Sequence, residues 1–229
     1  MSSHTIIVRR FLVTWSLFAI VGAVVAITGD KFRIHAAMNQ YHPWWLDGSF
    51  KILTLLADGW VPTILALVLL LVKDMRAFLM MGLSCGIGAI IVQVLKRQVF
   101  PDMDRPSAFQ QQLGTMDWVS GVDMHQHFSF PSGHSTAAFG MCMALAVILN
   151  RRQLAIPLAL LAAGMAYSRI HLSQHFLQDT VAGSAIGVFT ALLVYHLLYR
   201  SAFSKRAWLA RRLFRQNQNR PPIAASRSK

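Results

Sequence analysis

Acidic side chains are scarce in this chain of 229 residues, and none of them is glutamate. Nine aspartates stand against 22 lysines and arginines, so the formal net charge is +13. Without glutamate there is no HExxH motif, which excludes the usual signature of a helical zinc protease. The two cysteines, Cys85 and Cys142, give no disulfide framework and no cysteine-based metal site. Both lie in apolar segments, where a thiol behaves as a small apolar residue.

Charge of either sign is also rare. Charged residues make up 14% of the chain, hydrophobic residues make up 55%, and the mean hydropathy is +0.45, far from the values of soluble proteins. A helix needs about 20 apolar residues to cross a bilayer. We therefore expect an all-α bundle of six transmembrane helices within one membrane domain over residues 1–215, followed by a basic, disordered cytoplasmic tail over 216–229. The expected spans are about 11–29, 52–72, 77–95, 132–150, 153–168 and 180–199.

The first apolar run has an alternative interpretation as a cleaved signal peptide, because Arg9 and Arg10 precede it. Its apolar core exceeds the roughly 7–15 residues of a signal sequence, so we expect it to remain as the first helix. Two pairs of glycines, Gly82/Gly86 and Gly183/Gly187, have the spacing of close packing points between membrane helices.

The distribution of basic residues predicts the orientation. With the N-terminus in the cytoplasm, 15 of the 22 lysines and arginines fall in inside loops and in the tail, as the positive-inside rule expects. Only Asp74 among the aspartates falls inside. We expect a protein of a bacterial inner membrane with both termini in the cytoplasm. The basic tail is expected near anionic lipid and not on nucleic acid, because no aromatic and basic binding motif accompanies it.

Three polar clusters fall on the opposite, outer side. One runs from Lys96 to Pro106, one is Pro131-Ser-Gly-His134, and one runs from Ser168 to Asp179. His175 and Asp179 are four residues apart, so on a helix they share one face. A carboxylate that holds an imidazole in one tautomer prepares it as a nucleophile or a base. The sequence therefore predicts one outer cavity where these clusters meet.

The residue types in these clusters indicate phosphoryl chemistry. A helix that begins at Pro131-Ser-Gly-His134 can direct free N–H groups at an anion, and His134 can protonate a departing alkoxide. Basic side chains neutralise the oxygens of a transferring phosphoryl group, which is the main demand of this reaction. With Lys96, Arg105 and Arg169 available, a divalent metal is not required.

In this order the three clusters resemble the type 2 phosphatidic acid phosphatase (PAP2) family, the membrane relatives of vanadium haloperoxidases. The family pattern is Lys-x6-Arg-Pro, then Pro-Ser-Gly-His, then Ser-Arg-x5-His-x3-Asp, and the second and third motifs match fully. The first departs, because eight residues separate Lys96 from Arg105 and seven separate Arg97 from it. We expect Lys96 to face the cavity, with the extra residues in a bulge around Pro101, and Arg97 to reach the headgroups.

The resemblance implies a PAP2/haloperoxidase-like core and a membrane lipid phosphatase that works through a phosphohistidine, without metal or cofactor. His175 is then the nucleophile, Asp179 orients it, and His134 is the general acid. The phosphoryl oxygens would be held by Lys96, Arg105, Ser132, Gly133 and Arg169. Expected substrates are a polyprenyl diphosphate, phosphatidylglycerophosphate or phosphatidate, or a glycolipid phosphate.

Other functions stay open on the sequence. The same phosphohistidine could pass its phosphate to a second lipid, which would make the protein a phosphotransferase. A non-catalytic membrane protein that binds phospholipid headgroups is a third possibility. His171 and His175, with Asp179 beyond them, also have a spacing that could hold a metal ion. Neither the individual lipid nor the oligomeric state follows from the sequence.

Overall fold

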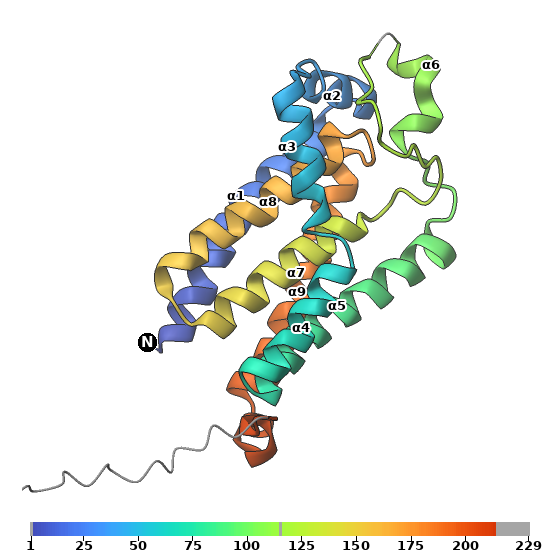
Figure 1. Ribbon diagram of the computed structural model, residues 1–229. Helices are drawn as coiled ribbons and strands as arrows, with labels where there is room; N and C mark the ends of the chain where they lie inside the picture. The colour runs from blue at the N-terminus through green and yellow to red at the C-terminus, as the bar shows by residue number, and fades with distance from the viewer. Residues whose placement is uncertain (1, 115, 214–229) are drawn as a thin grey trace, which may run out of the picture.

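The computed structural model describes residues 2–114 and 116–213, and all regular secondary structure in these ranges is helical (Figure 1). The expected tail, 216–229, lies outside the described residues. The α-helices are α1 (Ser3–Thr28), α2 (Lys31–Met38), α3 (Trp44–Leu55), α4 (Trp60–Val72), α5 (Met75–Val94), α6 (Gln110–Leu113), α7 (Gly133–Leu149), α8 (Ala155–His171) and α9 (Leu177–Tyr195). Short π-helical turns follow α5 (Leu95–Val99) and α9 (His196–Arg200), and 3-10 turns lie at Pro106–Phe109, Arg152–Leu154, Ala202–Lys205 and Ala207–Ala210.

The six membrane spans that we expected are not confirmed. Four helical segments are long and apolar enough to cross a bilayer: Ser3–Thr28, Met75–Val99, Arg152–His171 and Leu177–Arg200. The pair α3 and α4 passes the same test only together, with a bend of 51° between them. Helix α7 is apolar but has 17 residues, so it falls short of that length. By length and composition the described chain therefore has four spans, or five with the bent pair.

The expected span over 52–72 contains a break, because the chain leaves the helix between Leu55 and Trp60. Within this break the side chain of Asp58 accepts a hydrogen bond from the N–H of Gly59 at 2.8 Å. An aspartate that binds the neighbouring backbone competes with the helical hydrogen bonds, which favours such an interruption. Helix α3 begins earlier than expected, at Trp44, and the break after Leu55 separates it from α4.

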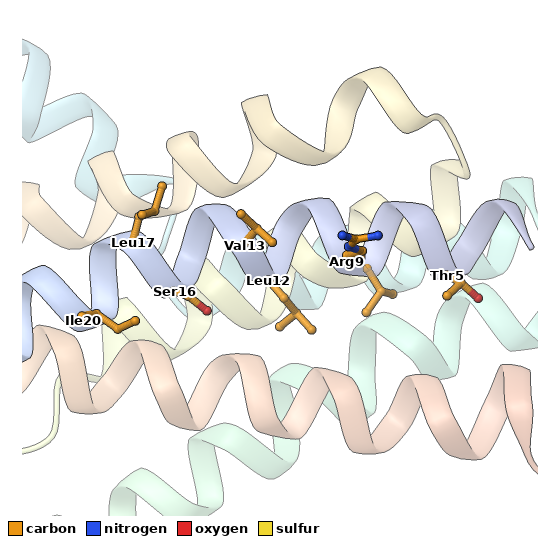
Figure 2. A pocket seen from close by; sticks show the side chains of 8 residues that line it. Thr5, Arg9, Leu12, Val13, Ser16, Leu17 and Ile20 are labelled. Atoms are coloured by element: carbon orange, nitrogen blue, oxygen red, sulfur yellow. The ribbon is translucent and has the colours of Figure 1, made fainter. Parts of the chain in front are cut away.

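Helix α7 forms the centre of the bundle and packs against α1, α5, α8 and α9. Twelve of its 17 residues are buried. Helix α1 instead exposes large aliphatic side chains such as Val13, Leu17 and Ile20, as expected of a face turned to lipid. Figure 2 shows that the groove along this face is lined by α1 alone, and none of the expected site residues lies there.

Glycine lets α9 approach α7 closely. A Cβ atom at Gly183 would overlap the carbonyl oxygen of Ser132, and one at Gly187 would overlap that of Thr136. The expected close packing at Gly183/Gly187 is confirmed. The same expectation for Gly82/Gly86 is wrong, since a Cβ at Gly86 would meet nothing within 4 Å and one at Gly82 would make only an ordinary contact at 4.0 Å.

This difference gives a matched pair of substitutions. Gly187→Ala should destabilise the protein by about 1–3 kcal/mol, because the added methyl group forces α9 away from the α7 backbone. Gly86→Ala should be neutral or stabilising by up to about 1 kcal/mol, because alanine favours the helix and the space is open. Thermal unfolding in detergent measures both, and equal effects of the two substitutions would contradict the packing described here.

Candidate active site

A cavity of about 560 Å³ opens where α3, α5, α7 and α8 meet the loop around residues 121–125. In Figure 1, helices α2, α3 and α6 lie at one end of the molecule and the marked N-terminus lies at the other. Of the eight expected site residues, six line this cavity and two, Ser132 and Asp179, do not. The six are Lys96, Arg105, Gly133, His134, Arg169 and His175.

Asp179 lies behind His175, at the start of α9. The Nδ1 atom of His175 is 3.4 Å from Oδ2 of Asp179. The same carboxylate oxygen accepts hydrogen bonds from the Ser129 hydroxyl at 2.5 Å and from the Phe176 N–H at 3.0 Å. A carboxylate can only accept, so it selects the tautomer of His175 that carries its proton on Nδ1. Nε2 then keeps its lone pair, as a nucleophile requires.

The environment of His175 keeps the ring neutral. Burial, followed by the positive charges of Arg105, Arg169 and Lys96 and by His134, lowers the pKa of His175 well below its ordinary value. An imidazole whose pKa lies well below its ordinary value stays unprotonated at physiological pH. The ring of His175 therefore rests in the neutral form that a nucleophile would need.

Lys96, Arg105 and Arg169, here called the cation cluster, bring three positive charges to one cavity. Among the described residues, the ion pairs all involve histidine, and no carboxylate pairs with the cluster. Arg169 donates from Nη1 to the Thr54 hydroxyl at 2.8 Å, but its buried Nε–H finds no acceptor in the described part of the chain. An unpaired buried donor costs about 1–3 kcal/mol. The cluster is thus suited to an anion that supplies the missing acceptor and the missing negative charge.

Gln174 links two members of the cation cluster. Its Oε1 atom accepts long hydrogen bonds from Nη1 of Arg105 at 3.3 Å and from Nη2 of Arg169 at 3.4 Å. Its Nε2 atom donates to the carbonyl oxygen of Asp123 at 3.0 Å, which fixes the loop over the cavity. A neutral amide oxygen holds the guanidinium groups in place and leaves their charge intact.

The motif analysis missed three residues that support the site: Thr54, Ser129 and Gln174. Thr54 is 115 residues from Arg169, and Ser129 is 50 residues from Asp179. Contacts over such separations have no local sequence signal. Gln174 directly precedes His175, but it lies between the defined positions of the third motif.

Ser132 marks the N-terminus of α7 and lies beside the cavity. Its hydroxyl oxygen accepts hydrogen bonds from the Ser135 N–H at 3.4 Å and from the Ser135 hydroxyl at 3.1 Å. Its own N–H donates to the carbonyl oxygen of Asp179 at 2.9 Å, and the residue is fully buried. Ser132 therefore ties the start of α7 to the start of α9, while Gly133 and His134 reach the cavity wall.

The irregular stretch of the first motif begins earlier than the expected bulge at Pro101. Residues Leu95–Val99 form a π-helical turn, closed by a hydrogen bond of 2.8 Å from the Phe100 N–H to the Leu95 carbonyl oxygen. A π-turn accommodates an extra residue within a helix and is frequent at functional sites. Lys96 in this turn is 8% exposed and lines the cavity, whereas Arg97 is exposed.

The sequence spacing suggested that His171 and His175 could hold one metal ion together, but no group of three possible ligands in the described residues contains both. In the described residues, His171 approaches Asp47 and His42, and this group contains neither His175 nor Asp179. The two imidazoles that face the cavity, His134 and His175, belong to no group of three possible ligands in that part of the chain.

Comparison with known proteins gives one family-model match whose range includes all three motif clusters. The family model described as the PAP2 superfamily matches residues 77–203. The lipid A 4'-phosphatase of Bacteroides thetaiotaomicron is 30% identical over 96 residues, which are 42% of this chain and 43% of that protein. The match thus spans less than half the length of that relative.

Two solved structures share the fold. The crystal structure of LpxE from Aquifex aeolicus has a TM-score of 0.62 and 22% identity, over 72% of this chain and 93% of that chain. The crystal structure of a transmembrane PAP2 type phosphatidylglycerolphosphate phosphatase from Bacillus subtilis has a TM-score of 0.58 and 21% identity, over 82% of this chain and 95% of that chain. Because the identities are this low, the two likenesses concern the fold alone.

The different positions of Lys96 and Arg97 generate a prediction. Removing a cation that holds a transferring phosphoryl group should cost on the order of 10²–10³ in rate, by analogy with the loss of an oxyanion donor. Lys96→Ala should therefore lower kcat/KM for a lipid phosphate by that amount. Arg97→Ala is the matched control and should stay within about threefold of the unaltered protein, because its side chain is exposed. The reverse ranking would assign the phosphate-binding role to Arg97.

Proposed function

Because the chain belongs to the PAP2 superfamily, we propose that it is a membrane lipid phosphatase that hydrolyses a phosphomonoester or diphosphate of a lipid. One observation carries this proposal: His175, backed by Asp179, shares a cavity with the unpaired cation cluster. A neutral nucleophile next to concentrated positive charge suits attack on a phosphorus atom that is surrounded by anionic oxygens.

In the first step the lone pair on Nε2 of His175 forms a bond to phosphorus while the bond from phosphorus to the lipid oxygen breaks. Once the anionic phosphate offsets the positive charge of the cation cluster, His134 can carry a proton, and it gives that proton to the departing oxygen. The Asp179 carboxylate stabilises the positive charge that develops on the His175 ring. The products are a phosphohistidine and either a lipid alcohol or, from a diphosphate, a lipid monophosphate.

In the second step water attacks the phosphorus atom, and the N–P bond breaks with its electron pair returning to Nε2 of His175. His134, neutral after the first step, takes a proton from the attacking water and is ready for the next cycle. Inorganic phosphate leaves the cavity.

The residues on the cavity wall supply the charge stabilisation that both steps need. The cation cluster and the N–H groups at the start of α7 can contact the phosphoryl oxygens, which is the role that metal ions fill in many other phosphoryl-transfer sites. We infer that catalysis uses no divalent metal and no organic cofactor.

The headgroup of the substrate is expected to carry hydroxyl groups. Asp58 and Asp123 line the same cavity as the cation cluster, with Lys51 close by. Carboxylates accept hydrogen bonds from the hydroxyl groups of glycerol or sugar, and they would repel a second phosphate. Two of the similar proteins are named lipid A 4'-phosphatase and phosphatidylglycerolphosphate phosphatase, which supports the same choice. We therefore place phosphorylated glycolipids and glycerolipids before polyprenyl diphosphates.

We further propose that the cavity faces the extracytoplasmic side of a bacterial inner membrane. Segments that are far apart in sequence and carry basic residues meet at a second crevice, outside the residues that line the cavity. This crevice is lined by His4, Lys73, Arg76 and Asn150, among others. In addition, Arg10 donates a hydrogen bond to the carbonyl oxygen of Arg152 at 3.3 Å. This gathering of basic residues supports a cytoplasmic location for that end of the bundle.

Release of phosphate by the purified protein across a panel of lipid monophosphates and diphosphates tests the proposal. The unaltered protein should release phosphate, and His175→Ala should show none, because the nucleophile is gone. Asp179→Asn should lose at least about 10²-fold in rate, because an amide can hold the imidazole in the wrong tautomer. His196→Ala, an exposed histidine in the turn after α9, is the control and should keep full activity.

The same assay separates the alternatives. Phosphate that appears on a second lipid, with no free phosphate in the absence of that lipid, would indicate a phosphotransferase. No turnover of any lipid by the unaltered protein, together with binding of these lipids, would indicate a headgroup-binding protein. Full turnover by His175→Ala would contradict the mechanism.

A further inference from the structure

Two imidazoles and a carboxylate converge at the junction of α3 and α8, outside the residues that line the catalytic cavity. Nε2 of His171 lies 2.7 Å from Oδ1 of Asp47, and Nδ1 of His42 lies 3.0 Å from the same oxygen. The three ligand atoms all lie within 4.8 Å of one another. The centroids of the two imidazole rings are 4.5 Å apart.

We propose that His42, Asp47 and His171 bind a divalent transition-metal ion of the zinc type. Imidazole nitrogen and carboxylate oxygen are the ligands that Zn²⁺ takes besides thiolate, and three protein ligands with a water molecule complete a tetrahedron. Bond lengths of about 2.0–2.1 Å in a tetrahedron place ligand atoms roughly 3.3 Å apart. The two measured distances, 2.7 and 3.0 Å, need to open by only about half an ångström to admit the ion.

The burial of the three side chains fits a bound ion with one open side. The side chain of His171 is 1% exposed and that of His42 is 9% exposed, whereas that of Asp47 is 18% exposed. An ion can therefore enter past Asp47 and keep a water ligand there. Two neutral imidazoles and one carboxylate leave a net charge of +1 on a bound divalent ion, so the site is not overloaded with negative charge.

The exchange of hydrogen bonds for metal bonds releases no proton. Without metal, His42 donates from Nδ1 and His171 donates from Nε2 to Asp47. With metal, these nitrogens use their lone pairs, and the proton of each ring lies on its other nitrogen. For His42 the other nitrogen, Nε2, is buried and has no hydrogen-bond partner among the described residues. No group on the Nε2 side of the ring therefore holds His42 in its metal-free tautomer.

A metal at this position would hold α3 against α8. Helix α3 is the detached half of the broken span, and it contacts α8 at two polar points. One is the Asp47–His171 pair, and the other is the 2.8 Å hydrogen bond from Arg169 to Thr54, two turns further along α3. An ion at the first point would therefore stabilise the helix that carries Thr54 to the cavity. This role is separate from the proposed phosphatase chemistry and does not depend on it.

Binding of Zn²⁺ and Co²⁺ to the metal-stripped, untagged full-length protein in detergent tests the proposal. A ligand that binds only the folded state raises Tm, and at a hundredfold excess over Kd we expect a saturable rise of about 5–10 °C. Co²⁺ in the same site should give the visible absorption of a tetrahedral complex, which a hydrogen-bonded network does not produce.

Two variants and a control locate the effect. His42→Phe keeps an aromatic ring beside His171 but removes a ligand, and Asp47→Asn keeps the side-chain shape while weakening metal binding. Both should lose the rise in Tm and the cobalt spectrum. His127→Ala is the control, because His127 also pairs with an aspartate, Asp104, at 2.8 Å but belongs to no group of three ligands in the described chain.

Each outcome decides the question. Loss of the Zn²⁺ effect in the two variants and its retention in His127→Ala would support the site. No effect of Zn²⁺ on the unaltered protein, or an equal effect in His42→Phe, would overturn it and leave a hydrogen-bonded network at this position. If the variants do not fold, the cobalt spectrum of the unaltered protein decides, and a spectrum without tetrahedral bands overturns the site.

Discussion

Three cations gathered in one cavity, with no carboxylate in ion-pair contact with them among the described residues, are the constraint on which the rest of the site depends. Like charges repel strongly where the dielectric constant is low, so the fold must hold the cation cluster by other means. Neutral dipoles do this: the Thr54 hydroxyl accepts from Arg169, and the Gln174 amide oxygen accepts from both arginines. The buried carboxylate of Asp179 is already engaged by Ser129 and Phe176 behind the nucleophile. The positive charge therefore remains available to an anionic ligand.

The close approach of α7 and α9 aligns the two catalytic histidines proposed above. Helix α7 begins next to His134, and α9 begins next to Asp179, the proposed orienting partner of His175. The N–H of Ser132 binds the carbonyl oxygen of Asp179 at 2.9 Å, and one turn further along α9 the absence of a side chain at Gly183 lets the backbones touch. Packing and chemistry are thus linked, because a larger residue at this contact would shift the acid relative to the nucleophile.

Much of this arrangement could be predicted from the sequence, and the failures have physical causes. Membership in the PAP2 superfamily and the all-helical membrane fold follow from motif order and hydropathy, and both are confirmed. The break at Asp58 was missed, because hydropathy averages over a window and one side chain that binds its neighbouring backbone barely changes the average. The supporting roles of Thr54 and Gln174 depend on contacts made only in the folded chain. The pairing of His171 with Asp47 was missed for the same reason, since helical spacing had suggested His175 as its partner.

The most direct test of the central claim is to trap the covalent intermediate. The protein is mixed with a lipid phosphate labelled on phosphorus, quenched in alkali within the first turnovers, digested, and mapped by mass spectrometry. Phosphate bound to nitrogen survives alkali and is lost in acid, unlike a phosphate ester of serine. We expect the label on His175 at an amount close to the enzyme concentration. Label on another residue, or steady turnover with no labelled protein at any time, would contradict the mechanism.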